Sequence, residues 1–339
     1  MLRSSVMSST RILEYLATPS SRRPISLFQP DLLGVPSAFG SGQAERLRLI
    51  GAMPGKMDAR MAQRFLIDLS WASSHLEGNT FTQLDTQTLI EWGDRPREES
   101  AENAVMILNH KRAIEYMLKL EVLEVDSICE IHKCLARNGG EEGSRHFLPD
   151  NLVGKLREYG EVEISGSSYL PPSSLGQEMR TELSRIAAAS MQADPLNGAF
   201  HLMSRLPYLQ PFMDVNKRTS RICANVPLLS HGMAPFTFVG VDRVDYHRGM
   251  VGFYELGDDS LLKEVFVKSY ALNAIALQSQ DPALRAALVT SRNEISDEIV
   301  RFVENGKAVD DERLASFLER KAESRTVAIP KASGMGPKL

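Results

Sequence analysis

The sequence predicts a mainly helical fold with one small β-hairpin. Apolar residues recur at helical steps of three and four over most of the 339 residues. The stretch 150–172 departs from this pattern, because Glu161-Val162-Glu163-Ile164 alternates and the turn-forming run Ser165-Gly166-Ser167-Ser168 follows, before Tyr169-Leu170. We therefore expect a hairpin at about residues 158–170 inside an otherwise helical core.

The composition is that of an ordinary globular protein, with 43% hydrophobic and 24% charged residues. The 39 basic and 43 acidic side chains give a net charge of -4, which offers no footprint for non-specific nucleic-acid binding. No apolar run reaches the roughly 18 residues of a membrane span. The first 23 residues also lack the apolar stretch of a secretory signal. With only three cysteines, these features predict a cytoplasmic protein.

Residues 1–56 contain scattered Pro and Gly, so we expect an irregular arm with one short helix near Arg11–Leu16. The next region, 57–120, begins with a clear amphipathic stripe. This stripe predicts a helix over 59–77 that stops at Gly78-Asn79. Its apolar positions are Met61, Phe65, Leu69, Ala72 and Leu76. Further helices are expected over 84–92 and 101–119.

Residues 121–275 form the expected core. A helix through Ile128, Ile131 and Leu135 should close at Asn138-Gly139-Gly140, and helical spacing resumes at Leu175 after the hairpin. Two more helices are expected over 196–209 and 218–230. A helical extension is expected over 276–323. Within it, Asp281-Pro282 predicts the start of a helix, because an Asp cap before proline at the first helical position is a sound start signal. The tail, 324–339, is predicted to be disordered.

One cluster on the core helix resembles half of a metal site. Cys129, His132 and Cys134 lie close in sequence, but no second Cys/His cluster completes them. Structural zinc requires four ligands. We therefore interpret these residues as a plain helix face.

The densest chemistry lies between two apolar helices. Asp214, Asn216, Lys217, Arg218 and Arg221 occur within eight positions. If a helix begins near Asn216, its first N–H groups lack partners and carry the positive end of the dipole. This arrangement is typical of a phosphate site in which Asp214 holds Mg²⁺. The alternative is a solvated helix start with surface ion pairs.

This loop resembles the signature of the Fic family, in which His-x-Phe-x-(Asp/Glu)-Gly-Asn-Gly-Arg-x-x-Arg precedes a helix. Five positions match at the correct spacing: Phe212, Asp214, Asn216, Arg218 and Arg221. Three positions depart from the pattern: Gln210 replaces the histidine, and Val215 and Lys217 replace the two glycines. The Asn-Lys-Arg form also resembles Doc, the kinase-like branch, which keeps the histidine.

Two distant segments add to the resemblance. Ser73-x-x-x-Glu77-Gly78 is similar to the family's inhibitory helix motif, (Ser/Thr)-x-x-x-Glu-(Gly/Asn). The expected hairpin lies where the family has a flap that clamps a target segment by strand addition. The implied flap residues are Ile164, Ser165, Gly166, Ser167 and Tyr169. The resemblance covers about residues 57–275 and implies a Fic/Fido-type helical bundle with a small β-hairpin flap.

The resemblance implies a function for each of these segments. A nucleoside triphosphate such as ATP would bind through Asn216, Lys217, Arg218 and Arg221, with Mg²⁺ on Asp214. A nucleotide monophosphate or a phosphate would then pass to a hydroxyl of a protein docked on the flap. Ser73 and Glu77 would restrain this reaction. The resemblance also leaves open whether the protein forms a homodimer.

Gln210 occupies the family's catalytic position, where a neutral amide cannot accept the hydroxyl proton. Losing a general base costs on the order of 10²–10⁴ in rate. His201, nine residues upstream, is a candidate replacement, whereas His75 is expected to be a surface or packing residue. Three hypotheses follow: a transferase, a nucleotide-binding pseudoenzyme, and an interaction protein without a ligand. The lost glycines also predict a shifted or inverted nucleotide pose.

Overall fold

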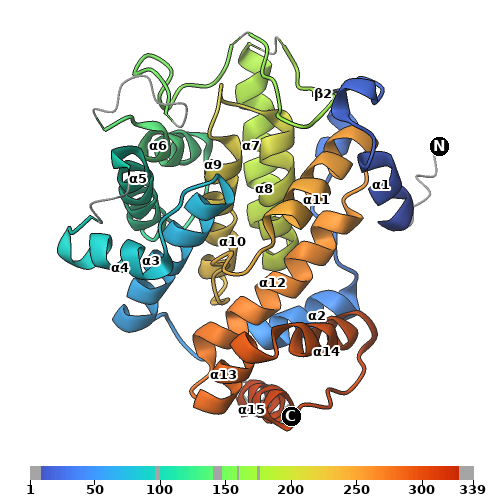
Figure 1. The fold of residues 1–339 in the computed structure, drawn as a ribbon. Helices are drawn as coiled ribbons and strands as arrows, with labels where there is room; N and C mark the ends of the chain where they lie inside the picture. Colours follow the sequence, from blue (N-terminus) through green and yellow to red (C-terminus); the bar gives the residue numbers. More distant parts are fainter. Residues whose placement is uncertain (1–8, 96–99, 140–146, 159, 174–175, 328–339) are drawn as a thin grey trace, which may run out of the picture.

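The computed structural model describes residues 9–95, 100–139, 147–158, 160–173 and 176–327, and within them the chain is mainly helical (Figure 1). Their one sheet has two short strands. The predicted fold class, a helical core with one small β element, is therefore confirmed. Gly140, Leu175 and residues 328–339, for which we made predictions, lie outside the described residues.

The N-terminal arm is more regular than the sequence predicts. A second helix, α2, runs over Ser41–Gly51 and buries Ala44, Leu47 and Ile50 along one face. The expectation of an irregular segment there is wrong. Gly40 and Gly42 suggest a loop, but the apolar residues that follow them form a helical face that packs against α12 and α14. The arm's other elements are α1 (Ser9–Leu16), the 3₁₀ turns η1 (Ser20–Arg22) and η2 (Pro30–Leu33), and β1 (Ser26–Leu27).

The helices predicted for residues 57–120 are present. Helix α3 (Ala59–Leu76) starts at Asp58, whose side chain accepts a hydrogen bond from the Met61 amide. After α3, Gly78 takes a φ of 96°, a conformation that glycine adopts without strain. Helices α4 (Gln83–Trp92) and α5 (Ala101–Met117) follow, and both pack against α3.

The helix at the centre of the molecule is α8 (Pro195–Leu209) (Figure 1). Almost all of its residues are buried. The expected helix over 218–230 is two helices, α9 (Asn216–Cys223) and α10 (Asn225–Ser230), joined at Ala224. The elements that pack against α8 include α7 (Gln177–Gln192), α9, α10, α11 (Arg243–Leu256) and α12 (Ser260–Gln278). Helix α6 (Val125–Ala136) packs between α5 and α9 and contacts both.

The C-terminal extension consists of α13 (Pro282–Thr290), α14 (Arg292–Asn305) and α15 (Glu312–Val327). The Asp281 side chain caps α13 by accepting from the Ala283 amide at 2.8 Å, as predicted. Helix α15 continues over 324–327, where the sequence predicted disorder. None of the described helices combines the length and apolar character that a membrane crossing requires.

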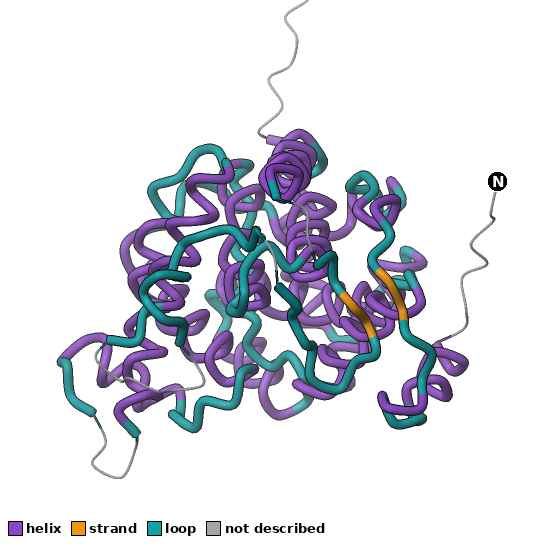
Figure 2. The backbone as a smooth tube through the Cα atoms, turned by 90° about the horizontal axis from the view of Figure 1, so that it is seen from above, coloured by secondary structure: helices purple, strands orange, loops and turns teal. Residues whose placement is uncertain are grey.

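The predicted β-hairpin is wrong, although its last two residues do form a strand. Strand β2 (Tyr169–Leu170) pairs in parallel with β1 of the N-terminal arm, so that Ser26 is opposite Tyr169 and Leu27 is opposite Leu170 (Figure 2). Residues 160–164 form no strand. The arm supplies the partner edge that a hairpin would have supplied locally. We call residues 160–168 the flap segment.

Candidate functional site

A cavity of about 880 Å³ lies where three predicted segments meet. The C-terminal end of α3 contributes Glu77, and the flap segment contributes Ile164 and Ser165. The signature loop contributes Gln210, Asp214, Val215, Asn216, Lys217 and Arg218. Helix α11 forms the remaining wall. The structure therefore brings together segments that lie more than 130 positions apart in sequence.

Gln210 fixes the loop rather than pointing freely into the cavity. It ends α8 in a left-handed conformation, with φ 52°. Its side-chain Oε1 accepts from Asn216 Nδ2 at 2.6 Å, and its Nε2 donates to the Pro207 carbonyl at 2.8 Å. Asn216 in turn accepts from the Phe212 amide at 3.0 Å and donates to the Phe212 carbonyl at 2.8 Å. The hydrogen bonds of the Gln210 side chain thus fix the conformation of the loop between α8 and α9.

Val215 adopts a backbone conformation that favours glycine. Its φ is 67°, at the first of the two positions where the signature pattern has Gly. For a side chain with a Cβ this conformation costs roughly 1–2 kcal/mol. Burial of the Val215 side chain, which is 2% exposed, offsets that cost by about 1.5–3 kcal/mol. The two contributions are of similar size, so valine in place of the pattern's glycine does not prevent folding.

Helix α9 begins at the cavity with a concentration of positive charge. No side chain caps its N-terminus, so its first amides are left to other partners. Arg218 is buried, and its NH1 has no hydrogen-bond partner among the described residues. The half-exposed carboxylate of Asp214 lies 3.7 Å from Arg218 NH2 and accepts from the Val215 amide at 2.6 Å. These groups suit an anion accompanied by a cation.

Glu77 reaches the two remaining cations of the loop. Its Oε1 accepts from Arg221 NH2 at 2.7 Å, and its Oε2 lies 3.5 Å from Lys217 Nζ. The predicted contact between Glu77 and Arg221 is therefore present. Burial alone would raise the pKa of Glu77, but the charges of Arg221, Lys217 and Arg218 outweigh burial and hold it well below its usual value. Glu77 is thus ionised.

Arg221 is fully buried and is held in place by α3. Its Nε donates to Ser73 Oγ at 2.9 Å, and its NH2 donates to the Ser73 carbonyl at 3.0 Å. His110 of α5 lies behind Ser73, with its Nε2 2.9 Å from Ser73 Oγ and its Nδ1 2.8 Å from the Met106 carbonyl. Burial lowers the pKa of His110 to about 3, so the ring is neutral. Sequence spacing gave no signal for this support.

His132 has a role that the interpretation as a plain helix face missed. Its ring stacks on Phe212 with centroids 3.8 Å apart. Its Nδ1 accepts from the Gly154 amide at 3.0 Å, so its Nε2 carries the hydrogen that faces the Asp214 carbonyl at 3.3 Å. Burial lowers the pKa of His132 to about 3. His132 therefore supports the signature loop from α6.

No group of three His, Cys, Asp or Glu side chains in the described part of the chain is arranged to hold a metal ion. Cys129 and Cys134 are half-buried thiols, and burial raises the pKa of Cys129 to about 11. A neutral thiol is a poor metal ligand. Asp214 would consequently depend on ligand oxygens and water to complete a Mg²⁺ site, as is usual for that ion.

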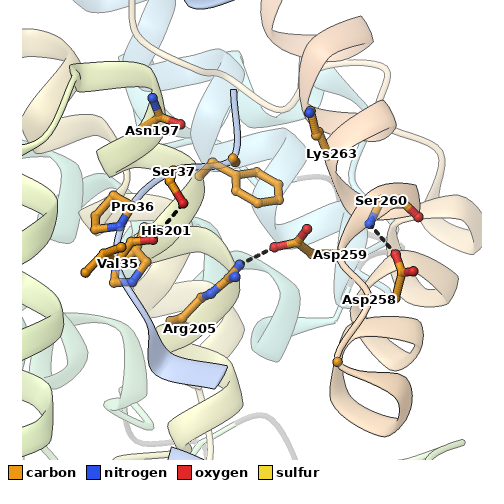
Figure 3. Close-up of a pocket in the computed structure, with 13 residues that line it drawn as sticks. Val35, Pro36, Ser37, Asn197, His201, Arg205, Asp258, Asp259, Ser260 and Lys263 are labelled. Carbon is orange, nitrogen blue, oxygen red and sulfur yellow. Dashed lines mark hydrogen bonds and ion pairs between the residues drawn. The ribbon is translucent and has the colours of Figure 1, made fainter. Parts of the chain in front are cut away.

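His201 lies in a second cavity, of about 380 Å³, between the arm, α8 and the start of α12 (Figure 3). Its Nε2 lies 2.8 Å from the Leu33 carbonyl and its Nδ1 2.9 Å from Ser190 Oγ. An Arg205–Asp259 ion pair of 2.6 Å crosses this cavity. The hypothesis that His201 replaces the missing base is therefore wrong. His75 is exposed and stacks on Trp71, as expected of a packing residue.

His247 of α11 is a cavity residue to which sequence reasoning gave no role. It is exposed and adjoins the flap segment, since a methyl group on Gly166 would lie 2.9 Å from His247 Nε2. Although the side chain reaches solvent, partial desolvation by its neighbours and the charges of Lys217, Arg23 and Arg243 lower the pKa of His247. Its neighbour Tyr246 packs over Arg221, with 5.7 Å from the guanidinium carbon to the ring centroid. Helix α11 thus lines the cavity beside α9.

Comparison with protein families identifies the domain that contains the signature loop. The model of the Fic/DOC family matches residues 122–228, which run from α6 to α10 and include the signature loop. The chain contains a Fic domain. The sequence resemblance to the Fic family is thereby confirmed over residues 122–228.

Curated relatives of the Fic domain are named as protein adenylyltransferases. The chain is 25% identical over 185 residues to "Protein adenylyltransferase Fic" of Nematostella vectensis, covering 52% of this chain and 40% of that protein. It is 26% identical over 178 residues to the protein of the same name from Drosophila persimilis, covering 51% and 33%. The chain therefore matches less than half the length of these relatives.

Solved structures share the Fic fold at low identity. A fragment of Fic-1 from C. elegans superposes with a TM-score of 0.54 and 16% identity, covering 76% of this chain and 73% of that one. A Fic family protein from Desulfovibrio desulfuricans G20 superposes with a TM-score of 0.53 and 16% identity, covering 86% and 89%. These likenesses establish the fold.

Proposed function

We propose that this Fic domain binds a nucleoside triphosphate with Mg²⁺ in the 880 Å³ cavity and transfers a nucleotide monophosphate to a protein hydroxyl under restraint by Glu77. The observation that carries the proposal is the position of the Glu77 carboxylate, 2.7 Å from Arg221 and 3.5 Å from Lys217. An anionic group of the protein there satisfies cations suited to a terminal phosphate. The relatives named adenylyltransferases support the type of transfer.

The chain's residues fit such a ligand. Lys217, Arg218 and the uncapped start of α9 offer the charge and the amides that phosphates require. Asp214 supplies one carboxylate, which suffices for Mg²⁺ when phosphate oxygens and water complete the shell. When bound, Mg²⁺ would offset charge on the phosphates. ATP is the ligand to test first.

The proposed reaction is an in-line displacement. The target hydroxyl oxygen forms a bond to the α-phosphorus, the bond from that phosphorus to pyrophosphate breaks, and the hydroxyl proton leaves to solvent or a base. Lys217 and Arg218 stabilise charge on the phosphates, which is usually the larger contribution in phosphoryl chemistry. Gln210 cannot take the proton, so the expected rate is low. A γ-phosphate presented in an inverted pose would give phosphate transfer instead.

A second candidate function is a nucleotide-binding pseudoenzyme. It is favoured by the Gln210 amide, whose oxygen is already engaged by Asn216 at 2.6 Å. In either case we propose that a target protein docks on the flap segment by strand addition, since its residues 160–164 form no strand. A homodimer and a reducing cytoplasmic setting are further proposals; the three free cysteines support the latter.

Calorimetry with MgATP on Glu77→Gly, compared with wild type, tests nucleotide binding with the restraint removed. Transfer is tested separately with α- and γ-labelled ATP, CTP, GTP and UTP. Label from the α position on protein supports nucleotide transfer, and label only from the γ position supports phosphate transfer. Binding without label identifies the pseudoenzyme. No binding of any triphosphate to Glu77→Gly would eliminate both and leave an interaction protein.

A further inference from the structure

A buried carboxylate on α11 joins the N-terminal arm to the flap segment. The side chain of Glu255 is 0% exposed. From the arm, Tyr15 donates to Glu255 Oε2 at 2.9 Å and Arg23 Nε forms an ion pair with the same oxygen at 3.2 Å. From the other side, Ser167 Oγ and the Ser168 amide donate to Glu255 Oε1 at 2.7 and 2.8 Å. One carboxylate therefore holds two segments that are far apart in sequence.

The two segments also bind each other directly. Arg23 NH2 donates to the Gly166 carbonyl at 2.5 Å, and Ser168 Oγ donates to the Pro24 carbonyl at 2.8 Å. The β1–β2 pairing continues this contact, so the arm lies along the flap segment's C-terminal side (Figure 2). We call residues 15–29 the latch. Apart from this sheet, the flap segment has few backbone partners of its own.

The contacts of the latch end at the cavity wall. Ser165 lines the cavity, and the next residue, Gly166, accepts the hydrogen bond from Arg23 and adjoins His247. The latch itself contributes no residue to the cavity lining. Any effect of the latch on a ligand must therefore pass through the flap segment.

The charges make this attachment all-or-none. Arg23 is 8% exposed as a residue, so its guanidinium and the Glu255 carboxylate have both left water. Removing one member of a buried pair leaves the other uncompensated, which is strongly unfavourable. When the latch leaves, Arg23 and Tyr15 depart together, and the buried carboxylate keeps only the hydrogen bonds from Ser167 and Ser168. Water should then enter and compete with these two residues for the carboxylate. The latch and the flap segment should consequently release together.

We propose that Glu255 is a positioning residue that acts through Arg23 to make the N-terminal latch a control element of the flap segment, so that displacing residues 15–29 opens the cavity. This rests on the proposed function only for the identity of what the cavity binds. The release itself is a property of the chain.

Hydrogen exchange read by mass spectrometry tests the release without any ligand. The variants are Arg23→Gln, Glu255→Gln and the double variant, with the exposed neighbour Arg22→Gln as matched control. Arg23→Gln should speed exchange in peptides covering 160–170 by about tenfold or more, because loss of a charged buried contact favours local opening. Peptides of α6 should exchange as in wild type, and Arg22→Gln should change neither.

The double variant separates positioning from general damage. Because it leaves no unpaired buried charge, the double variant should fold with a near-normal melting temperature, and exchange of its flap segment should return toward the wild-type rate. Dissociation of a fluorescent ATP analogue should also accelerate in Arg23→Gln. Faster exchange confined to residues 15–29, or spread equally over α6, would overturn the proposal. Failure of the analogue to bind the Glu77→Gly variant would refute the proposed function alone, since the exchange result stands by itself.

Discussion

Glu77 lies between two cations of different origin, Arg221 at 2.7 Å and Lys217 at 3.5 Å. Arg221 belongs to the Fic signature, whereas Lys217 stands where that pattern has its second glycine. The carboxylate is therefore held by one cation more than the pattern supplies. A ligand that displaces Glu77 must compensate both charges, which suits a doubly charged terminal phosphate.

Replacing Glu77 with Gln should raise MgATP affinity by about tenfold or more, because the negative charge of Glu77 then no longer competes with a phosphate for Arg221 and Lys217. Isothermal calorimetry measures this change. The exposed Glu121→Gln serves as control for a general change of net charge. Equal affinities of wild type and Glu77→Gln would show that the carboxylate does not occupy the phosphate position.

Replacing Arg218 with Ala on the Glu77→Gly background should weaken MgATP binding by about 10- to 150-fold, the value of a charged hydrogen bond. Lys217→Ala should act in the same direction. The exposed Arg137→Ala is the matched control. Binding that survives both substitutions would locate the phosphates away from the start of α9.

Gln210→His should create or raise transfer of label from α-labelled ATP, by about 10²–10⁴ if a proton acceptor is the limiting group. The effect should be clearest together with Glu77→Gly. Gln210→Asn, another neutral amide, is the control. An inert Gln210→His/Glu77→Gly variant that still binds nucleotide would show that Val215 and Lys217 have reshaped the site beyond this repair.

The stability of the fold should fall as the pH drops below about 6.5, the ordinary histidine pKa. His110 and His132 have folded pKa values of about 3, so between these limits the unfolded chain binds more protons than the folded chain. Their contribution is complete above pH 6.5 and is lost as the pH falls toward 3. His132→Gln should reduce the slope of unfolding free energy against pH, near pH 5.5, by about 1.2 kcal/mol per unit. Urea titrations measure it, and an unchanged slope would contradict a neutral His132.

Val215→Gly should change the unfolding free energy by no more than about 1 kcal/mol, because relief of the positive φ offsets loss of the buried side chain. It should strengthen MgATP binding by letting the backbone approach the phosphates. Thermal unfolding and calorimetry measure the two effects. A large loss of stability would mean that side-chain packing dominates at this position.

The sequence predicts the local elements and the contacts that a motif specifies. Helix α3 follows from its own apolar stripe, and the contact between Glu77 and Arg221 follows from two spaced motifs. The hairpin fails for a reason no local pattern contains. The edge of β2 is taken by Ser26–Leu27, a partner two residues long with no strand signal of its own.

Buried support behind the loop is equally hard to predict. His132 and His110 lie on helices whose periodic pattern is the same with or without their contacts to Phe212 and Ser73. Such roles arise from packing between helices, and one sequence carries no record of it. Helix α2 was missed for the opposite reason, since glycines at its start outweighed a genuine stripe.

The pairing of arm and flap also sets an order of events during synthesis. Arg23 and Gly166 are separated by 143 positions, so the arm leaves the ribosome long before its partner exists. At 5–20 residues per second the delay is roughly 7–30 s. Helices α3 to α6, with mostly local contacts, have ample time to form first. A bulky fusion at the N-terminus would therefore disturb the last step of folding. The helical core would be assembled, but the N-terminal arm would not be paired with the flap segment beside the cavity.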